Sequence, residues 1–385
     1  MTQTRSGRST AAGDKHKLDE APASPPAKAQ RKSSGAKAEK QLTLDESLGV
    51  ESEVKEEIGN DDNDDDTEEE KADGVAKKKK KSADQSDGTA AEPRNEEDSA
   101  VKAHGRGGAL PASILEKGII YFFFRGRIDI EHPEKVDDIA RTYIILRPIP
   151  LDAKLTDGPI GDAGNSRLIA VPKKKLPRTG KDRWIAFVDK TNASFDQLKK
   201  EFLASNDYTT QAGLDRHSPA ASPFGEGVYA ITTTGRESHL AYFLTLPEKL
   251  GDVQTDLGLK EKGSWILSTR NPKYPAPPNV AFPEAPDYPQ EIFDEFRSRR
   301  WMGTLPKHLI PKAQFLLIGE SSGVDQALKA DEKDTKATER PIEEMEQLEH
   351  EDMERMEHLG KDASEAIFTD LEAQASGYPK LQTTF

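Results

Sequence analysis

Histidine, arginine and tyrosine side chains occur close together in the sequence around one predicted β-hairpin. Arg216 and His217 lie in the loop that leads into this hairpin. Tyr229 lies on its first strand, and His239 and Tyr242 lie on its second. Because histidine titrates near neutral pH and arginine pairs with anions, these residues predict a pocket for an anionic substrate at one end of a sheet. The alternative is that they are half-buried residues of the sheet and its connecting loop.

Two further arginines, Arg125 and Arg127, stand where the chain leaves a predicted buried strand. The run Ile119–Arg125 is apolar except at its end and is rich in β-branched and aromatic residues. Such a run is typical of a strand that is buried on both faces. The two arginines are therefore candidates for binding, and the simpler interpretation is a solvated strand end that pairs with nearby carboxylates.

The sequence lacks the familiar motifs that bind a nucleotide cofactor or a metal ion. Without cysteine, the chain has no disulfide, no thiolate nucleophile and no cysteine metal site. The phosphate loop Gly-x-x-x-x-Gly-Lys-Ser/Thr and the zinc motif His-Glu-x-x-His are also missing. Gly225-Glu226-Gly227 leads into a strand and lacks a third glycine, so it does not match a dinucleotide-binding turn. We expect no cofactor and no metal.

Five consecutive lysines form a basic block, and they are Lys77, Lys78, Lys79, Lys80 and Lys81. They follow an acidic block at residues 60–70, in a segment that is too polar to offset the entropy of ordering. An extended basic segment matches what a nuclear import receptor reads, so we predict this receptor as a partner and nuclear localisation, with or without a cytoplasmic pool. The alternative is a polybasic stretch that offsets the acidic block or touches RNA or anionic lipid.

The charge is distributed unevenly along the 385 residues, whose formal net charge is −14. Residues 111–320 carry 29 basic and 27 acidic side chains, which is the balance of an ordinary globular domain. We therefore do not expect nucleic acid to bind through this core. The absence of a long apolar run and of a hydrophobic signal core predicts an intracellular protein that does not interact with membranes.

Strand-like runs and a few helical patterns alternate irregularly through the middle of the chain. We predict strands at 141–147, 167–171, 183–188, 228–234, 239–246, 265–269 and 314–318. We predict helices from Asn192 or Ser194 to Ala204, at 252–257 and at 288–300. This order favours an α+β fold with one largely antiparallel sheet. The expected domains are a disordered charged tail at 1–107, a globular core at 108–320 and an acidic, partly helical region at 321–385.

An imperfect helical stripe of apolar residues runs through the glutamate-rich C-terminal region, and its members are Ile342, Met345, Leu348, Met353, Met356 and Leu359. Asp362 could cap a second helix that extends to Ala375. One interpretation is a solvated acidic helix that packs weakly on the core. The other is a helix that docks on a surface or associates with itself.

Three long strings in the core carry a resemblance to a known family: residues 115–127, 158–165 and 225–242. They resemble an uncharacterised family of filamentous-fungal proteins that is often labelled "BTB domain transcription factor". The resemblance covers about residues 105–320. It implies no established activity and supplies no catalytic residues.

Two classes of function follow from these observations. The charged tail and the import signal favour a nuclear, non-enzymatic interaction or regulatory protein with an as yet unidentified protein partner. The alternative is an enzyme or small-molecule binder with a pocket near the 215–242 loop and hairpin. The sequence does not predict the oligomeric state.

Overall fold

The computed structural model describes residues 99–106, 110–210, 213–275, 284–329, 340–359 and 384. The predicted import signal at 77–81 and the predicted second C-terminal helix at 362–375 lie outside these residues. The described part begins with β1 (Val101–Lys102), which pairs with β4 (Lys154–Leu155). β1 therefore lies before residue 108, the boundary that the composition suggested for the core.

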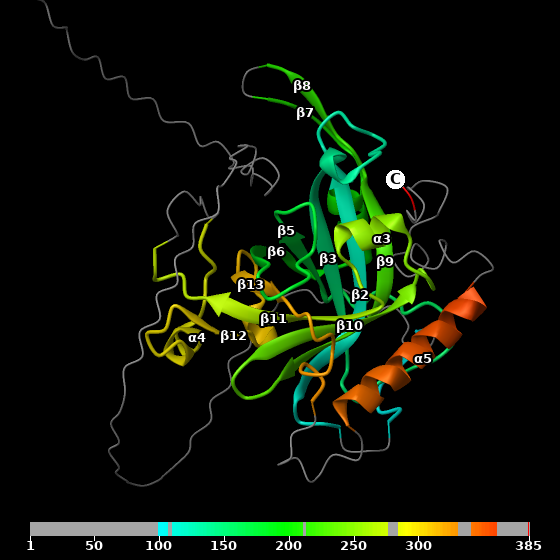
Figure 1. The fold of residues 1–385 in the computed structure, drawn as a ribbon, viewed down its shortest axis with the longest axis vertical. Helices are drawn as coiled ribbons and strands as arrows, with labels where there is room; N and C mark the ends of the chain where they lie inside the picture. The colour runs from blue at the N-terminus through cyan, green and yellow to red at the C-terminus, as the bar shows by residue number, and fades with distance from the viewer. Residues whose placement is uncertain are drawn as a thin grey trace, which may run out of the picture. The chain divides into compact units, whose positions relative to one another are not determined.

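Eight strands form a closed antiparallel barrel (Figure 1). They are β2 (Ile114–Gly126), β3 (Ile139–Ile149), β5 (Ser166–Val171), β6 (Arg183–Ala193), β9 (Ala221–Thr233), β10 (Ser238–Leu246), β11 (Lys262–Arg270) and β13 (Gln314–Gly319). Their order is β10-β9-β2-β3-β5-β6-β13-β11, and the pairing of β10 with β11 closes the ring. A short strand, β12 (Trp301–Gly303), pairs with β11 beside the barrel. The predicted α+β class with a largely antiparallel sheet is confirmed.

Alternation along the strands fills the barrel with apolar side chains. On β2, the residues Ile120, Phe122 and Phe124 belong to the buried apolar cluster inside the barrel. The ring centroid of Phe122 lies 5.3 Å from that of Tyr242 and 6.2 Å from that of Trp265. The interior of an eight-stranded barrel is just wide enough for side chains to fill it, which is what these aromatic rings do.

Two glycines permit the strands to approach closely where the barrel bends. A Cβ atom at Gly227 would lie 2.0 Å from the carbonyl oxygen of Phe243 on β10. A Cβ atom at Gly118 would lie 2.1 Å from the carbonyl oxygen of Arg147 on β3. Both contacts are with backbone, so any side chain at these positions would push neighbouring strands apart.

Short helices cover the outside and one end of the barrel. The helix α2 (Phe195–Leu198) continues as a π-helix, η3 (Lys199–Leu203), and Ser194 caps it through a capping box with Gln197. This confirms the predicted helix and selects Ser194 as its N-cap. The helix α3 (Asp252–Leu257) matches its predicted bounds, and its side chains Val253 and Leu257 join the interior cluster.

The helix α4 (Gln290–Glu295) is shorter than the predicted 288–300. Arg297 and Ser298 adopt φ values of 46° and 62°, and this left-handed backbone ends the helix. Short 3-10 turns, η2 (Val136–Asp138) and η4 (Pro306–His308), complete the connections. A separate two-stranded arm, β7 (Asn206–Thr209) with β8 (Asp215–Ser218), lies beyond the end of β9 (Figure 1).

The longest described helix, α5 (Pro341–Leu359), lies along the outer surface of the barrel (Figure 1). It contacts β4, β9 and β10. Met345 and Leu348 are completely buried, whereas Met353 is 41% exposed, so the predicted stripe is only partly the packed face. Among the described residues, no helix has the length and apolar character needed to cross a membrane.

Candidate functional site

The residues predicted to form one pocket lie on three different surfaces. Tyr229 and Tyr242 point into the barrel, where both belong to the apolar cluster. His239 lies on the outer face of β10, because it stands three positions from Tyr242 and alternate strand residues point to opposite faces. Arg216 and His217 lie on the β8 arm. The prediction that these residues converge at one sheet end is therefore wrong.

Tyr229 belongs to a small polar cluster inside one end of the barrel. Its hydroxyl group donates a hydrogen bond of 2.7 Å to Oε1 of Glu116, and Nη1 of Arg167 lies 2.5 Å from the same oxygen. Burial, with the Glu116 carboxylate beside it, holds the pKa of Tyr229 well above its usual value. Tyr229 therefore stays protonated, and its hydroxyl group on β9 donates a hydrogen bond to Glu116 on β2.

Tyr242 stacks on Trp265 with a centroid distance of 4.7 Å, and its hydroxyl oxygen accepts a hydrogen bond from the Lys260 backbone N–H at 3.1 Å. Burial raises the pKa of Tyr242 far above its usual value. Both tyrosines are therefore packed residues of the barrel interior, and they are more deeply buried than the half-buried sheet residues of the alternative.

His239 holds the segment after β13 against the barrel. Its Nδ1 lies 3.0 Å from Oε2 of Glu320, and Ser264 donates a hydrogen bond of 2.6 Å to the same carboxylate oxygen. All three side chains are buried. The carboxylate lies between the serine and the histidine, which is the wrong order for a triad in which histidine takes the serine proton. The cluster therefore fastens one segment to another.

Arg216 and His217 are brought together with carboxylates from the loop after β2. Nη1 of Arg216 lies 2.8 Å from Oδ2 of Asp129. The two ring nitrogens of His217 lie 2.5 Å from Asp207 and 2.5 Å from Glu131. The hydrogen bond to Asp207, with the charge of Glu131, raises the pKa of His217. The pairs with Asp129 and Glu131 fasten the arm to the loop, whereas the pair with Asp207 joins β7 to β8 within the arm.

The two arginines at the end of β2 behave differently from each other. Arg125 is buried, donates a hydrogen bond of 2.6 Å to the Pro219 carbonyl oxygen and lies over the Phe202 ring at 5.5 Å. Arg127 is exposed, and its backbone N–H donates to the Asp138 carbonyl oxygen at 2.7 Å. Arg125 is therefore a structural anchor, and only Arg127 presents its side chain at the surface.

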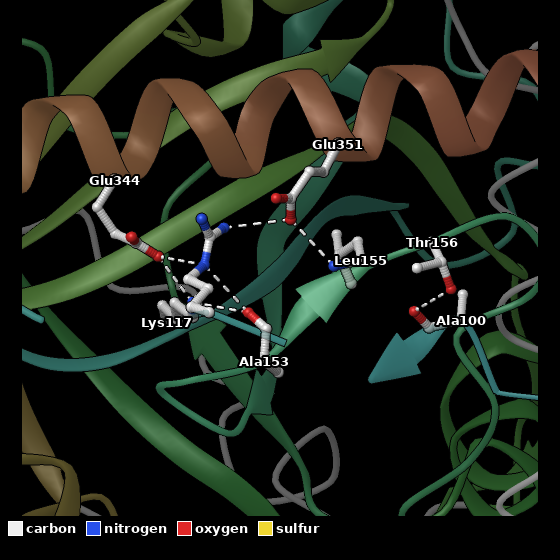
Figure 2. Close-up of polar contacts among 8 residues, drawn as sticks. Ala100, Lys117, Ala153, Leu155, Thr156, Glu344 and Glu351 are labelled. Atoms are coloured by element: carbon white, nitrogen blue, oxygen red, sulfur yellow. Dashed lines mark hydrogen bonds and ion pairs between the residues drawn. The ribbon is translucent and has the colours of Figure 1, made fainter. Parts of the chain in front are cut away.

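A group of charged side chains lies between the barrel and α5 (Figure 2). We call Arg106, Lys117, Glu344 and Glu351 the α5 ionic cluster. Oε1 of Glu344 lies 2.7 Å from Nζ of Lys117 and 3.0 Å from Nε of Arg106. Oε2 of Glu351 lies 3.1 Å from Nη2 of Arg106 and accepts a hydrogen bond of 3.0 Å from the Leu155 backbone N–H. Arg106 thus joins two carboxylates that stand two helical turns apart.

A second group of charges lies near the other end of the same helix. Nη2 of Arg355 lies 2.7 Å from Oδ1 of Asp352 and 3.5 Å from Oε1 of Glu226 on β9. Thr245 on β10 donates a hydrogen bond of 2.7 Å to Oδ2 of Asp352. Arg355, Asp352 and Glu226 are all completely buried. The contacts tie α5 to β9 and β10.

Burial shifts the pKa values of two members of the α5 ionic cluster. Desolvation lowers the pKa of Lys117, and the hydrogen bond to Glu344 opposes this shift. Desolvation raises the pKa of Glu351, against the Leu155 N–H and the charge of Arg106. Both shifts mean that the charged forms are held at a cost, which mutual attraction only partly offsets.

Sequence reasoning did not single out Lys117, Arg106 or the glutamates of α5. Two signals were present: a lysine directly before a fully buried strand run, and two glutamates seven positions apart on the helix face that carries Met345 and Leu348. Neither signal indicates that the lysine and the glutamates contact each other, because they are far apart in the chain. Among the described residues, no group of three or more histidine, aspartate or glutamate side chains is arranged to hold a metal ion.

Comparison of the chain with protein-family models, with curated proteins and with solved structures finds no match. The chemistry of the described residues is therefore the basis for a function. Beneath α5, Lys117, Arg106 and the Leu155 N–H hold two carboxylates of the helix.

Proposed function

We propose that this chain is a nuclear, non-enzymatic interaction protein whose barrel presents its outer surface to a protein partner. The observation that carries the proposal is the occupied interior, in which Phe122, Tyr242 and Trp265 pack against one another. A barrel of eight strands encloses either side chains or one small ligand. Because side chains occupy this interior, we expect the barrel to bind its partner through its outer surface.

The nuclear part of the proposal rests on the five lysines from Lys77 to Lys81. Replacement of all five by alanine in a fluorescent fusion of the full chain should move the steady-state signal from nucleus to cytoplasm. Replacement of Lys173, Lys174 and Lys175, a basic run in the core, is the matched control and should leave the signal unchanged. Nuclear accumulation that survives the first replacement would contradict the assignment.

The interaction part is tested by affinity purification of the tagged full chain with quantitative mass spectrometry. We expect a protein partner in stoichiometric amount, retained when the five-lysine variant is directed to the nucleus by a foreign import signal. A ligand-dependent increase in melting temperature with a mixture of small metabolites, with no protein partner, would contradict the proposal.

The alternative of an enzyme or small-molecule binder near residues 215–242 draws no support from the described contacts, because its candidate residues lie on separate surfaces. Membership of the fungal family that the sequence resembles stays a prediction. It would be consistent with either class, since that family has no established activity.

A further inference from the structure

The face of the barrel beneath α5 has the chemistry of a receptor for carboxylates. Lys117 and Arg106 donate to Glu344, Arg106 and the Leu155 N–H donate to Glu351, and each of these donors belongs to the barrel side. Figure 2 shows both glutamates pointing from the helix toward this set of donors. Around Glu344 and Glu351, the cations and N–H groups are therefore on the barrel side and the anions are on the helix, whereas near the other end of α5 the helix residue Arg355 pairs with Glu226 on β9.

The spacing of these contacts defines the kind of helix that fits. Glu344 and Glu351 stand seven residues apart, so their Cα atoms are separated by about 10 Å along the helix axis. Met345 and Leu348 fill the apolar positions between them and are completely buried. Asp352 adds a third carboxylate, which accepts from Thr245. The face selects an amphipathic helix with acidic residues at positions i, i+7 and i+8 and apolar residues at i+1 and i+4.

The contact between α5 and the barrel can open without disrupting the barrel. The barrel closes through its own strand pairings, so α5 can leave without breaking a sheet hydrogen bond. The helix buries Glu344, Glu351, Asp352 and Arg355 together with few apolar side chains. Desolvation of buried charges offsets most of their attraction, so such an interface is specific without being strong. An element held in this way belongs to the less stable part of a structure.

We propose that this face is a docking site for an acidic amphipathic helix of a partner protein, and that α5 occupies it as an internal competitor. The inference rests on the proposed interaction function and specifies its surface. A tethered helix acts at high effective concentration, so a partner must supply either a better-matched helix or a higher concentration. Release of α5 would uncover Lys117 and the two-carboxylate contact of Arg106.

The test uses the full-length chain and a fluorescein-labelled peptide of residues 340–359 as the probe. Met345→Asp places a charge on the buried side of α5 and should release the chain's own helix. Met353→Asp makes the same chemical change at a position that is 41% exposed and is the matched control. We expect the peptide, followed by fluorescence anisotropy, to bind Met345→Asp at least tenfold more tightly than it binds wild type or Met353→Asp.

Two further variants keep the result interpretable. Adding Lys117→Glu to Met345→Asp should abolish peptide binding, and a peptide with Glu344→Lys and Glu351→Lys should not bind to any of the chains. Near-UV circular dichroism checks that the barrel of each variant keeps its packed aromatic residues. If Met345→Asp loses that signal, Leu348→Asp, which alters a neighbouring buried position, takes its place.

Three outcomes would overturn the proposal. Equal affinity for all chains with an intact barrel would show that α5 does not compete for the face. Binding that survives Lys117→Glu would show that the cations do not select the helix. Formation of dimers by exchange of α5 between two copies, detected by light scattering, would assign the face to a second copy. These results leave the nuclear fusion assay unaffected, so failure here is distinct from failure of the proposed function.

Discussion

Two residues on opposite faces of strand β2, Phe122 and Lys117, are buried by opposite means. The inner face carries Phe122, which packs on Phe224, Tyr242 and Trp265. The outer face carries Lys117, which is equally buried but donates to Glu344 on α5. Apolar burial is non-directional and stabilises the barrel in proportion to area. Buried ion pairs contribute little net stability but depend on geometry, so they determine which helix binds and in which register.

Removal of an aromatic ring from the interior should have the largest effect. Phe122→Ala leaves a cavity among three other aromatic residues and should lower the free energy of unfolding by about 3–5 kcal/mol. Denaturant unfolding followed by tryptophan fluorescence measures this loss. The control is Leu214→Ala, since Leu214 is 56% exposed and its removal should change stability by no more than about 0.5 kcal/mol. A loss as small as the control's would mean that the interior is not tightly packed.

Removal of a buried cation from the α5 contact should affect the helix and spare the barrel. Arg355→Ala removes the cation that Asp352 and Glu226 share. If α5 stayed docked, the two buried carboxylates would lower the free energy of unfolding by about 3–5 kcal/mol. Release of α5 avoids this cost. Hydrogen exchange should therefore show lost protection in α5 and unchanged protection in β2.

The matched control for that experiment is Arg340→Ala at the start of α5. Arg340 pairs with Glu343, and both side chains are well exposed, so α5 should keep its protection. If Arg355→Ala also reduced protection in β2, the ionic contact would stabilise the barrel itself. The contrast between the apolar interior and the ionic α5 contact would then be wrong.

The pH dependence of the α5 contact follows from the raised pKa of Glu351, whose ordinary value is 4.5. A group with a raised folded-state pKa favours the docked state below its ordinary pKa, and this contribution is lost as pH rises through the folded pKa. Docking of α5 should therefore weaken as pH increases from 4.5 toward neutrality. Methyl NMR signals of Met345 and Met356 follow the docking. Glu351→Gln should flatten this pH dependence, and a slope that persists in the variant would point to another group.

The smallest effect is expected at the rim of the same interface. Lys262 on β11 lies 2.8 Å from Glu349, and their side chains are 40% and 18% exposed. Water and salt screen such a pair, so Lys262→Ala should change stability by no more than about 1 kcal/mol. Unfolding measured at low and high salt should show that this small difference shrinks as ionic strength rises. If Lys262→Ala destabilised the protein as much as Arg355→Ala, the exposed Lys262–Glu349 pair would contribute as much as the buried pairs of Arg355.

Much of the secondary structure could be predicted because local patterns carry it. The buried strand at Ile119–Arg125, the 228–246 hairpin and the cap at Ser194 depend on residues that are close in sequence. The candidate site could not be predicted in the same way. His239 and Tyr242 are near each other in the chain, but the alternation of β10 sends them to opposite faces. Nearness in sequence was therefore a poor guide to nearness of side chains.

By itself the sequence determined where strands, turns and apolar faces occur, because periodicity and capping act over a few residues. It also determined the chain's charge distribution, its lack of cysteine and its five-lysine block. Only the tertiary structure decided that the sheet closes through β10 and β11 and that Lys117 meets Glu344, a residue 227 positions away. Contacts of this kind depend on strand register and on the docking of a helix against a curved sheet, and no local pattern encodes them.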